Sequence, residues 1–168
     1  MEKLDDLIEY LLKENTGVQI SQIPTDRNEK RNLYRSLCNI REPKPISKEY
    51  LQIENEYLQE ELHKKNITTQ EEIKPVRQKI GLWQGDITTI KIEAIVNAAN
   101  SQGLGCFVPC HKCIDNQIHT FAGVSLRLEC KEKMKQKGYH LHTGEAFITK
   151  GYNLPSKYII HTVRTNHI

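Results

Sequence analysis

The chain has 168 residues, of which 38% are hydrophobic and 27% are charged. This length suits one main fold with an appended unit, and no apolar run approaches the roughly 20 residues that a membrane span needs. The net charge of +3 is uneven, since residues 1–75 carry 12 Lys and Arg against 15 Asp and Glu, whereas residues 76–168 carry 12 against 6, so the second part suits an anionic ligand.

Helical periodicity dominates the first part of the chain. Apolar residues recur every three or four positions, and the pattern stops before turn-forming residues. Ser47 and either Thr25 or Asp26 are the expected N-caps of two of the helices. We expect helices over residues 2–14, 26–40 and about 47–65, and a helical N-terminal extension over residues 1–72.

From residue 73 the sequence changes to short segments rich in β-branched and aromatic residues. One apolar face among residues 114–137 predicts a single helix between two pairs of strands. The alternation of strands and helix indicates an α/β sandwich. The strands are expected at residues 80–84, 92–97, 146–149 and 158–163.

Three of the five cysteines lie within one segment, Cys106-Phe107-Val108-Pro109-Cys110-His111-Lys112-Cys113. Thiolate and imidazole are the ligands that zinc prefers, and Cys106, His111 and Cys113 would leave a fourth position open for water or substrate. Incidental thiols, or a redox pair of Cys110 and Cys113, are alternatives that the spacing leaves open. The odd cysteine count and an acidic N-terminus unlike a secretory signal indicate a reducing, cytoplasmic location.

Polar residues and glycines follow the strand expected at 92–97. Asn100, Gly103 and Gly105 would place an amide and accessible backbone at the carboxyl end of a strand, where open α/β sheets bind ligands. An ordinary turn is the alternative.

Two aspartates, Asp115 and Asp86, each have a structural and a functional interpretation. Asp115, beside Asn116, either caps or complements the dipole of the following helix, or it orients or deprotonates a water beside a metal. Asp86 is either a turn residue or an acceptor for the amino group of a ligand.

Together these segments resemble a macrodomain, an α/β/α sandwich, over about residues 80–163. The resemblance is closest to the zinc-containing macrodomains of bacteria and fungi, which remove ADP-ribose from modified proteins. Some of these are encoded beside a sirtuin-type ADP-ribosyltransferase. The segments that carry the resemblance are Gly85-Asp86-Ile87-Thr88, Ala94-Ile95-Val96-Asn97-Ala98-Ala99-Asn100, residues 106–116 and Phe121-Ala122-Gly123.

The resemblance implies a hydrolase that uses one Zn2+ ion to release mono-ADP-ribose from protein side chains. Asp86 would accept from the adenine amino group, with Ile87 beside it, and Asn100 and Asp115 would be the catalytic residues at the distal ribose. The resemblance also implies that Asn116, Cys113 and Ile114 contact the ligand. The implied zinc ligands are Cys106, His111 and Cys113, and Cys110 is not among them.

The same resemblance implies further strands and a second glycine-rich loop after residue 163, where this chain reads Arg164-Thr165-Asn166-His167-Ile168. We therefore expect residues 73–168 to form a partial macrodomain lacking its C-terminal part, with impaired hydrolysis. An ADP-ribose-binding module without catalysis and a structural zinc protein are the alternatives. Nucleic acid is not an expected partner, because the basic half lacks interleaved aromatic residues.

Overall fold

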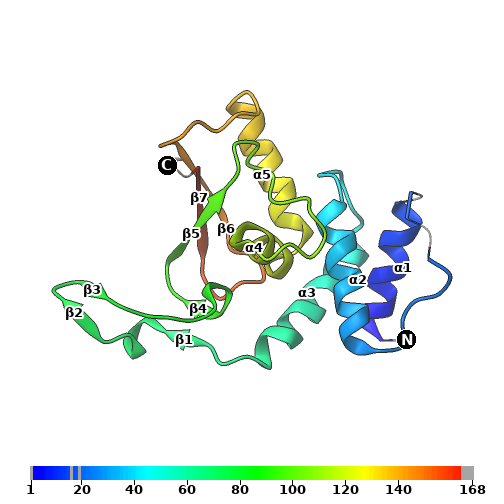
Figure 1. The fold of residues 1–168 in the computed structure, drawn as a ribbon, viewed down its shortest axis with the longest axis horizontal. Coiled ribbons are helices and arrows are strands. Elements are labelled where there is room, and N and C mark those ends of the chain that lie inside the picture. Colours follow the sequence, from blue (N-terminus) through cyan, green and yellow to red (C-terminus); the bar gives the residue numbers. More distant parts are fainter. Residues whose placement is uncertain (1, 16, 19, 164–168) are drawn as a thin grey trace.

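Three helices form the N-terminal part of the chain, as the sequence predicts (Figure 1). The computed structural model describes residues 2–15, 17, 18 and 20–163. The caps also agree with the prediction, because the Asp26 side chain accepts from the backbone N–H groups of residues 28 and 29, and that of Ser47 accepts from residue 50. The helices are α1 (Lys3–Glu14), α2 (Arg27–Ile40) and α3 (Lys48–His63).

The three helices share one apolar core, and α5 (Val124–Gln136) contributes to it through Val124. Removing these side chains from water supplies most of the stability of such a small unit. The core therefore also fixes the helical unit against α5. The buried members from the three helices are Leu4, Leu7, Ile8, Leu11, Tyr34, Leu37, Tyr50, Tyr57 and Leu58.

A three-stranded sheet forms the second part, with α4 (Ile114–Ala122) and α5 over one face (Figure 1). The central strand pairs in parallel with β5 and antiparallel with β6. The predicted strands at 92–97, 146–149 and 158–163 are confirmed, the first shifted by two residues. Their bounds are β5 (Ala94–Ala99), β6 (Ala146–Lys150) and β7 (Tyr158–Val163).

The single helix predicted over residues 114–137 is wrong, since the structure has two helices that meet at Gly123. This residue has a φ of +93°, a conformation that side chains with a Cβ rarely adopt. A Cβ there would lie 2.7 Å from Glu54 Oε2. The break therefore depends on a contact with α3 that the local sequence does not reveal.

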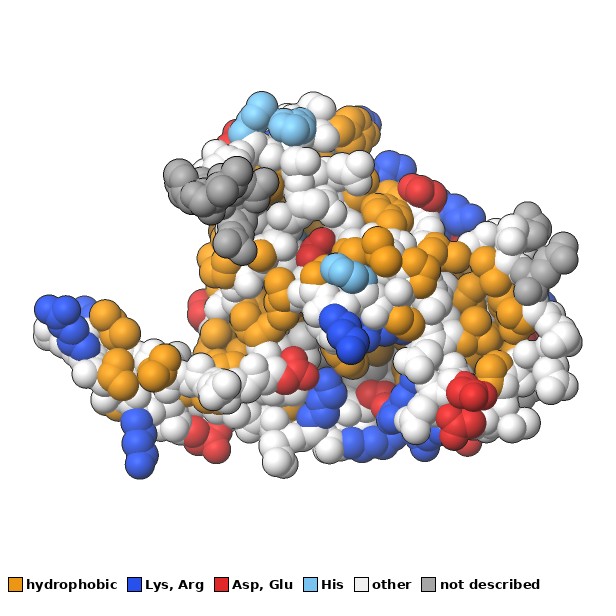
Figure 2. Space-filling view, in the orientation of Figure 1, with side chains coloured by type: hydrophobic (Ala, Val, Ile, Leu, Met, Phe, Trp, Pro, Cys, Tyr) orange, Lys and Arg blue, Asp and Glu red, His pale blue; other side chains and the backbone are white. Residues whose placement is uncertain are grey.

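The strand predicted at residues 80–84 is also largely wrong. Only β3 (Ile80–Gly81) is extended, and it pairs with β2 (Pro75–Arg77) in a hairpin that projects from the body with exposed hydrophobic and basic side chains (Figure 2). Leu82 is 78% exposed. A short apolar run forms a core strand only where a sheet lies beside it. In the described part of the chain, β3 pairs with β2 alone. The remaining short elements are β1 (Thr68–Thr69), paired with β4 (Ile90–Lys91), and the 3-10 turns η1 (Gln70–Glu72) and η2 (Ile87–Thr89).

None of the described residues covers the face of the sheet that points away from α4 and α5. Val96, Ile148 and Tyr158 on this face are 54%, 54% and 44% exposed. The expectation of a truncated macrodomain rests on the segment after residue 163, and this segment lies outside the described residues. No helix in the described part combines the length and apolarity required to cross a bilayer.

Candidate functional site

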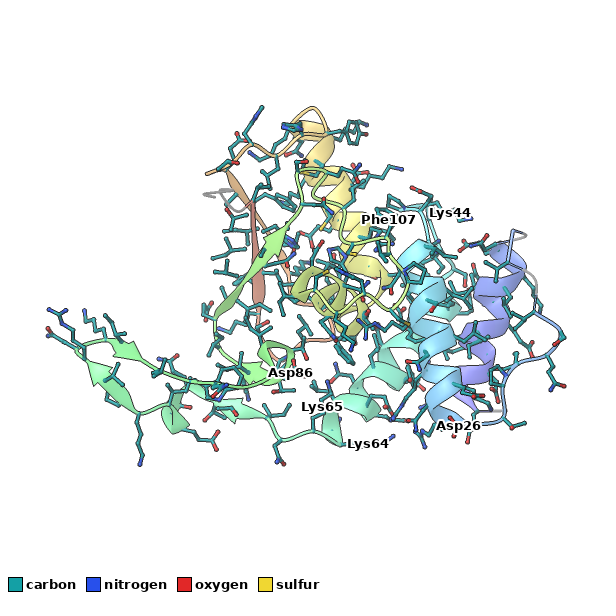
Figure 3. All side chains as sticks on the ribbon, viewed as in Figure 1. Asp26, Lys44, Lys64, Lys65, Asp86 and Phe107 are labelled. Atoms are coloured by element: carbon teal, nitrogen blue, oxygen red, sulfur yellow. The ribbon has the colours of Figure 1, made fainter. Side chains whose placement is uncertain are left out.

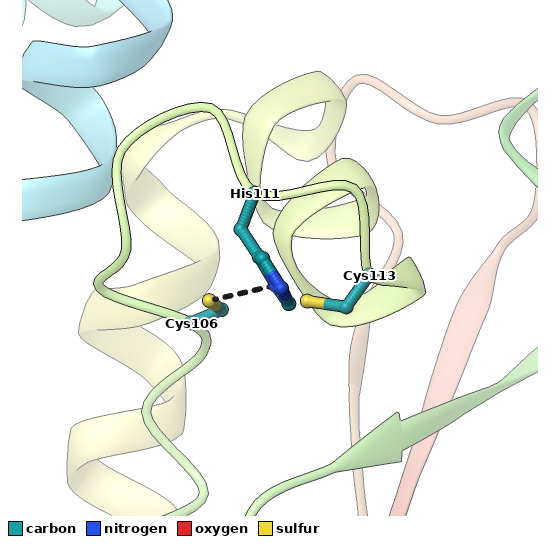
Figure 4. A group of neighbouring side chains, drawn as sticks. All are labelled: Cys106, His111 and Cys113. Carbon is teal, nitrogen blue, oxygen red and sulfur yellow. Dashed lines mark hydrogen bonds between the residues drawn. The ribbon is translucent and has the colours of Figure 1, made fainter.

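The structure brings Cys106, His111 and Cys113 together in the loop that leads into α4 (Figure 4). One potential ligand atom from each residue lies within 4.8 Å of the others, and Cys106 Sγ is 3.7 Å from His111 Nδ1. The side chain of Cys110 points elsewhere, since its Sγ lies 3.2 Å from Ser36 Oγ on α2. The loop thus groups two sulfurs and one imidazole, a donor set suited to zinc.

Asn100 shapes the turn by which the chain leaves β5 and enters this loop. Its Oδ1 accepts from the Gly103 N–H at 3.1 Å, and its Nδ2 donates to the Gly105 carbonyl at 3.2 Å. Gly105 has a φ of +85°, and a Cβ there would lie 2.7 Å from the ring of His119. Both ends of the Asn100 amide therefore hold the turn in this structure.

Cys113 is the N-cap of α4, because its Sγ accepts from the Asn116 N–H at 3.4 Å. The suggestion that Asp115 caps this helix is wrong, although its position in the first turn does complement the helix dipole. Burial raises the pKa of the Cys113 thiol, the Asn116 N–H opposes this, and the neighbouring Cys106 thiol raises the pKa further. The proximity of the two sulfurs therefore favours the neutral thiol at Cys113 in this structure.

Asp115 lies beneath the loop and is 4% exposed. Asn97, on β5, donates from Nδ2 to Asp115 Oδ1 at 2.8 Å, and His119 Nε2 is 3.6 Å from the same oxygen. Burial raises the pKa of the Asp115 carboxyl, against the opposing effects of the Asn97 hydrogen bond and the charge of Arg127. The carboxyl is therefore fixed in direction by Asn97.

Asn116 is fully buried, and its amide joins the loop to α2. Its Oδ1 accepts from Arg35 Nε at 3.0 Å and Nη2 at 2.6 Å, while its Nδ2 donates to the Val108 carbonyl at 2.9 Å. Arg35 was not predicted as a site residue. Arg35 and Asn39 are polar residues on one face of the same helix, and this spacing is the only local signal that such a polar contact exists.

Asp86 caps η2, which lies against α4, by accepting from the N–H and the hydroxyl of Thr88 at 2.9 and 2.7 Å. Lys65 Nζ lies 3.3 Å from Asp86 Oδ2, and the two side chains face each other at the end of α3 (Figure 3). Partial burial raises the pKa of Asp86, but the Thr88 hydrogen bonds and Lys65 outweigh it and bring the pKa below its ordinary value. Ile87 and Ile114 pack against the main core. The turn role of Asp86 is thus present, and its carboxylate is half-exposed at the surface.

A second group of potential ligands, His119, Cys130 and His161, lies in the core. His161 is hydrogen-bonded to Asn97 at 3.1 Å and to Thr149 at 2.9 Å. Burial lowers the pKa of His161 to about 4. His161 is therefore a buried, hydrogen-bonded core histidine.

The chain is similar to known macrodomains and to proteins named protein-ADP-ribose hydrolase. Residues 96–167 match the family model of the Macro domain. Over 94% of the chain the sequence is 52% identical to a protein-ADP-ribose hydrolase of Treponema medium, and over 96% it is 46% identical to one of Staphylococcus aureus strain MRSA252. The chain covers 62% and 60% of these two relatives, so it spans about three fifths of their length.

The solved Trypanosoma brucei macrodomain in complex with ADP-ribose superposes with a TM-score of 0.52 at 28% identity, over 73% of this chain and 56% of that one. The sheet β5-β7-β6 with its covering helices thus has the expected fold, although part of the sheet face is bare. The chain has the macrodomain fold, and its residues 96–167 match the Macro domain model.

Proposed function

We propose that this protein is a zinc-dependent hydrolase that removes mono-ADP-ribose from modified protein side chains. The observation that carries the proposal is the convergence of Cys106, His111 and Cys113 within 4.8 Å, in a loop between a macrodomain strand and helix. The similarity to curated protein-ADP-ribose hydrolases supports the reaction class.

The residues of the loop fit zinc in chemistry and in number. Two thiolates and one imidazole are common zinc ligands, and three protein ligands leave a coordination position for water or substrate. His111 is exposed while both cysteines are half-buried, so the group opens toward solvent. Zinc bound there would supply a Lewis acid that polarises a water or a ribose oxygen.

Asp115 and Asn100 would act on either side of this loop. Asn97 holds Asp115 through Oδ1, and a carboxyl with a raised pKa can take a proton from an attacking water and return it to the leaving side chain. Asn100 would orient the distal ribose by shaping the turn that contains Gly103 and Gly105. The result would be addition of water at the anomeric carbon and release of the protein side chain.

Asp86 and the residues around α4 would hold the nucleotide. The half-exposed Asp86 carboxylate is ionised and can accept from the adenine amino group, with Ile87 beside it. Cys113, Ile114 and Asn116 would lie near the sugar. A sirtuin-type ADP-ribosyltransferase as partner and a cytoplasmic location are further parts of this proposal, and they rest on the resemblance.

One observation favours a second candidate, an ADP-ribose-binding module without catalysis. Every polar atom of the Asn100 and Asn116 amides makes a hydrogen bond within the protein, so in this arrangement both amides hold the loop in place. Such a module would bind ADP-ribose and leave the modified protein intact.

The test is release of ADP-ribose from a mono-ADP-ribosylated protein, at the reduced rate expected of the purified chain, alongside calorimetric binding of free ADP-ribose. We expect Cys113→Ala and Asp115→Ala to lose release, and Cys110→Ser to retain it because its hydroxyl replaces the thiol beside Ser36. Release at the unaltered rate in Cys113→Ala would contradict the zinc-dependent mechanism. Binding without release would favour the binding module, and bound zinc without nucleotide binding would favour a structural zinc protein.

A further inference from the structure

The loop that carries Cys106, His111 and Cys113 is held from outside the Macro domain region by α2. Arg35 Nη2 donates to the His111 carbonyl at 2.6 Å, and the same guanidinium donates to Asn116 Oδ1. One planar group therefore joins the backbone of an expected ligand to the first turn of α4. The helix end that presents Cys113 and the loop that presents His111 are fixed by a common donor.

One turn further along α2, Asn39 fixes the middle of the loop. Its Oδ1 accepts from the Cys110 N–H at 2.9 Å, and its side chain is 1% exposed. Cys110 has a φ of +51°, which residues with a Cβ rarely adopt and which persists only where neighbouring contacts enforce it. The Ser36 hydroxyl, 3.2 Å from Cys110 Sγ, is a second such contact.

The start of the loop is tied to the same helix through Arg127 of α5. Arg127 Nη2 donates to the Cys106 carbonyl at 3.2 Å, and Nη1 donates to the carbonyls of Cys38, Asn39 and Arg41 at the end of α2, at 3.1, 2.7 and 2.8 Å. Its guanidinium also lies 4.2 Å over the ring of Phe107. The backbone carbonyls of Cys106 and His111 thus have contacts that lead to α2, and Cys113 is linked to α2 through Asn116.

We propose that Arg35 is a positioning residue for the metal, and that α2 preorganises the loop so that its three ligands bind the ion together. This inference rests on the proposed zinc site and extends it, because it gives the N-terminal helices a part in metal binding. The loop is otherwise exposed at residues 108, 109, 111 and 112, so without α2 the ion would have to order it on binding. Arg35 is half-buried at the contact, and contacts behind metal ligands commonly contribute about 10–100-fold to affinity.

The test uses the full chain loaded with Co2+, whose thiolate charge-transfer and visible bands report on tetrahedral coordination by sulfur. Affinity is measured by competition with a chelator for the unaltered protein, Arg35→Ala, Arg35→Lys and Arg27→Ala. Arg27 is the matched control, since it lies on the same helix but pairs with Glu61 at 3.1 Å, away from the loop. Circular dichroism of the metal-free variants checks that each is folded.

We expect Arg35→Ala to lose about 10–100-fold in Co2+ affinity with altered charge-transfer bands, and Arg27→Ala to match the unaltered protein. Arg35→Lys should be intermediate, because one ammonium can reach the His111 carbonyl or the Asn116 amide but does not span both. Equal affinity and spectra in Arg35→Ala and the unaltered protein would overturn the inference alone. Absence of Co2+ binding by the unaltered protein would instead contradict the zinc site on which it rests. If Arg35→Ala does not fold, Arg35→Lys carries the test, and unchanged affinity there overturns the inference.

Discussion

Glu54 on α3 is a buried carboxyl whose titration we expect to govern the stability of the helical unit. It is 1% exposed, its Oε1 accepts from the hydroxyls of Tyr34 and Tyr50 at 2.8 and 3.3 Å, and its Oε2 accepts from the Val124 N–H at 3.0 Å. Burial raises the pKa of Glu54 from 4.5 to about 7, although these three donors and the charge of Arg41 oppose the shift. The neutral form is therefore favoured by folding.

The sign of the pH dependence follows from proton binding. Between pH 4.5 and about 7 the folded state binds more protons at Glu54 than the unfolded state, so the free energy of unfolding falls as pH rises. At about 1.4 kcal/mol per pH unit, this loss is on the order of 3 kcal/mol across the interval. The contribution is fully present below pH 4.5 and is lost above the folded-state pKa.

Glu54→Gln isolates this effect, since an amide is neutral at every pH. Its oxygen can accept from the Val124 N–H and its two N–H groups can donate to the tyrosine hydroxyl oxygens, whereas the protonated carboxyl can donate to one of them. Urea unfolding of both proteins should show the variant gaining on the order of 3 kcal/mol relative to the unaltered protein from below pH 4.5 to above pH 7. A stability difference that stays constant over this range would refute the reasoning, because all other groups titrate equally in both proteins.

Two further predictions concern the core. Gly123→Ala should lower the free energy of unfolding by about 1–3 kcal/mol in urea titration, because φ is +93° and the new Cβ would lie 2.7 Å from Glu54 Oε2; unchanged stability would contradict the assigned conformation. The pKa of His161 is lowered by burial from 6.5 to about 4, so the His161 contribution to the free energy of unfolding should rise with pH across that interval, opposite in sign to that of Glu54, since the unfolded state binds more protons there. The stability difference between the unaltered protein and His161→Gln should therefore grow with pH, and a constant difference would show that His161 makes no such contribution.

The helices of the N-terminal unit could be predicted because their signals are local. The apolar stripes of α1, α2 and α3, and the caps at Asp26 and Ser47, depend on residues a few positions apart. The break at Gly123 could not be predicted, since it reflects contact with Glu54 on another helix. The strand prediction at residues 80–84 was wrong for a related reason: a β-branched run gives no information about whether a sheet lies beside it.

The candidate site, too, could be predicted only where its signals are local. The cysteines and His111 lie within eight residues, so their chemistry and spacing indicated the group before the structure did. The contacts that hold it come from far along the chain, since Arg35 and the His111 carbonyl are separated by 76 residues. Capping of α4 was one of the roles left open for Asp115, the better capping residue by type, whereas the cap position is occupied by Cys113.

The most direct test of the account is the zinc content of the folded, purified protein, measured by elemental analysis after dialysis against metal-free buffer. We predict one zinc per chain in the unaltered protein and in Cys110→Ser, and none in Cys106→Ser with Cys113→Ser. Folded protein without zinc, or zinc retained when both ligand cysteines are replaced, would contradict the central claim that Cys106, His111 and Cys113 form the metal centre.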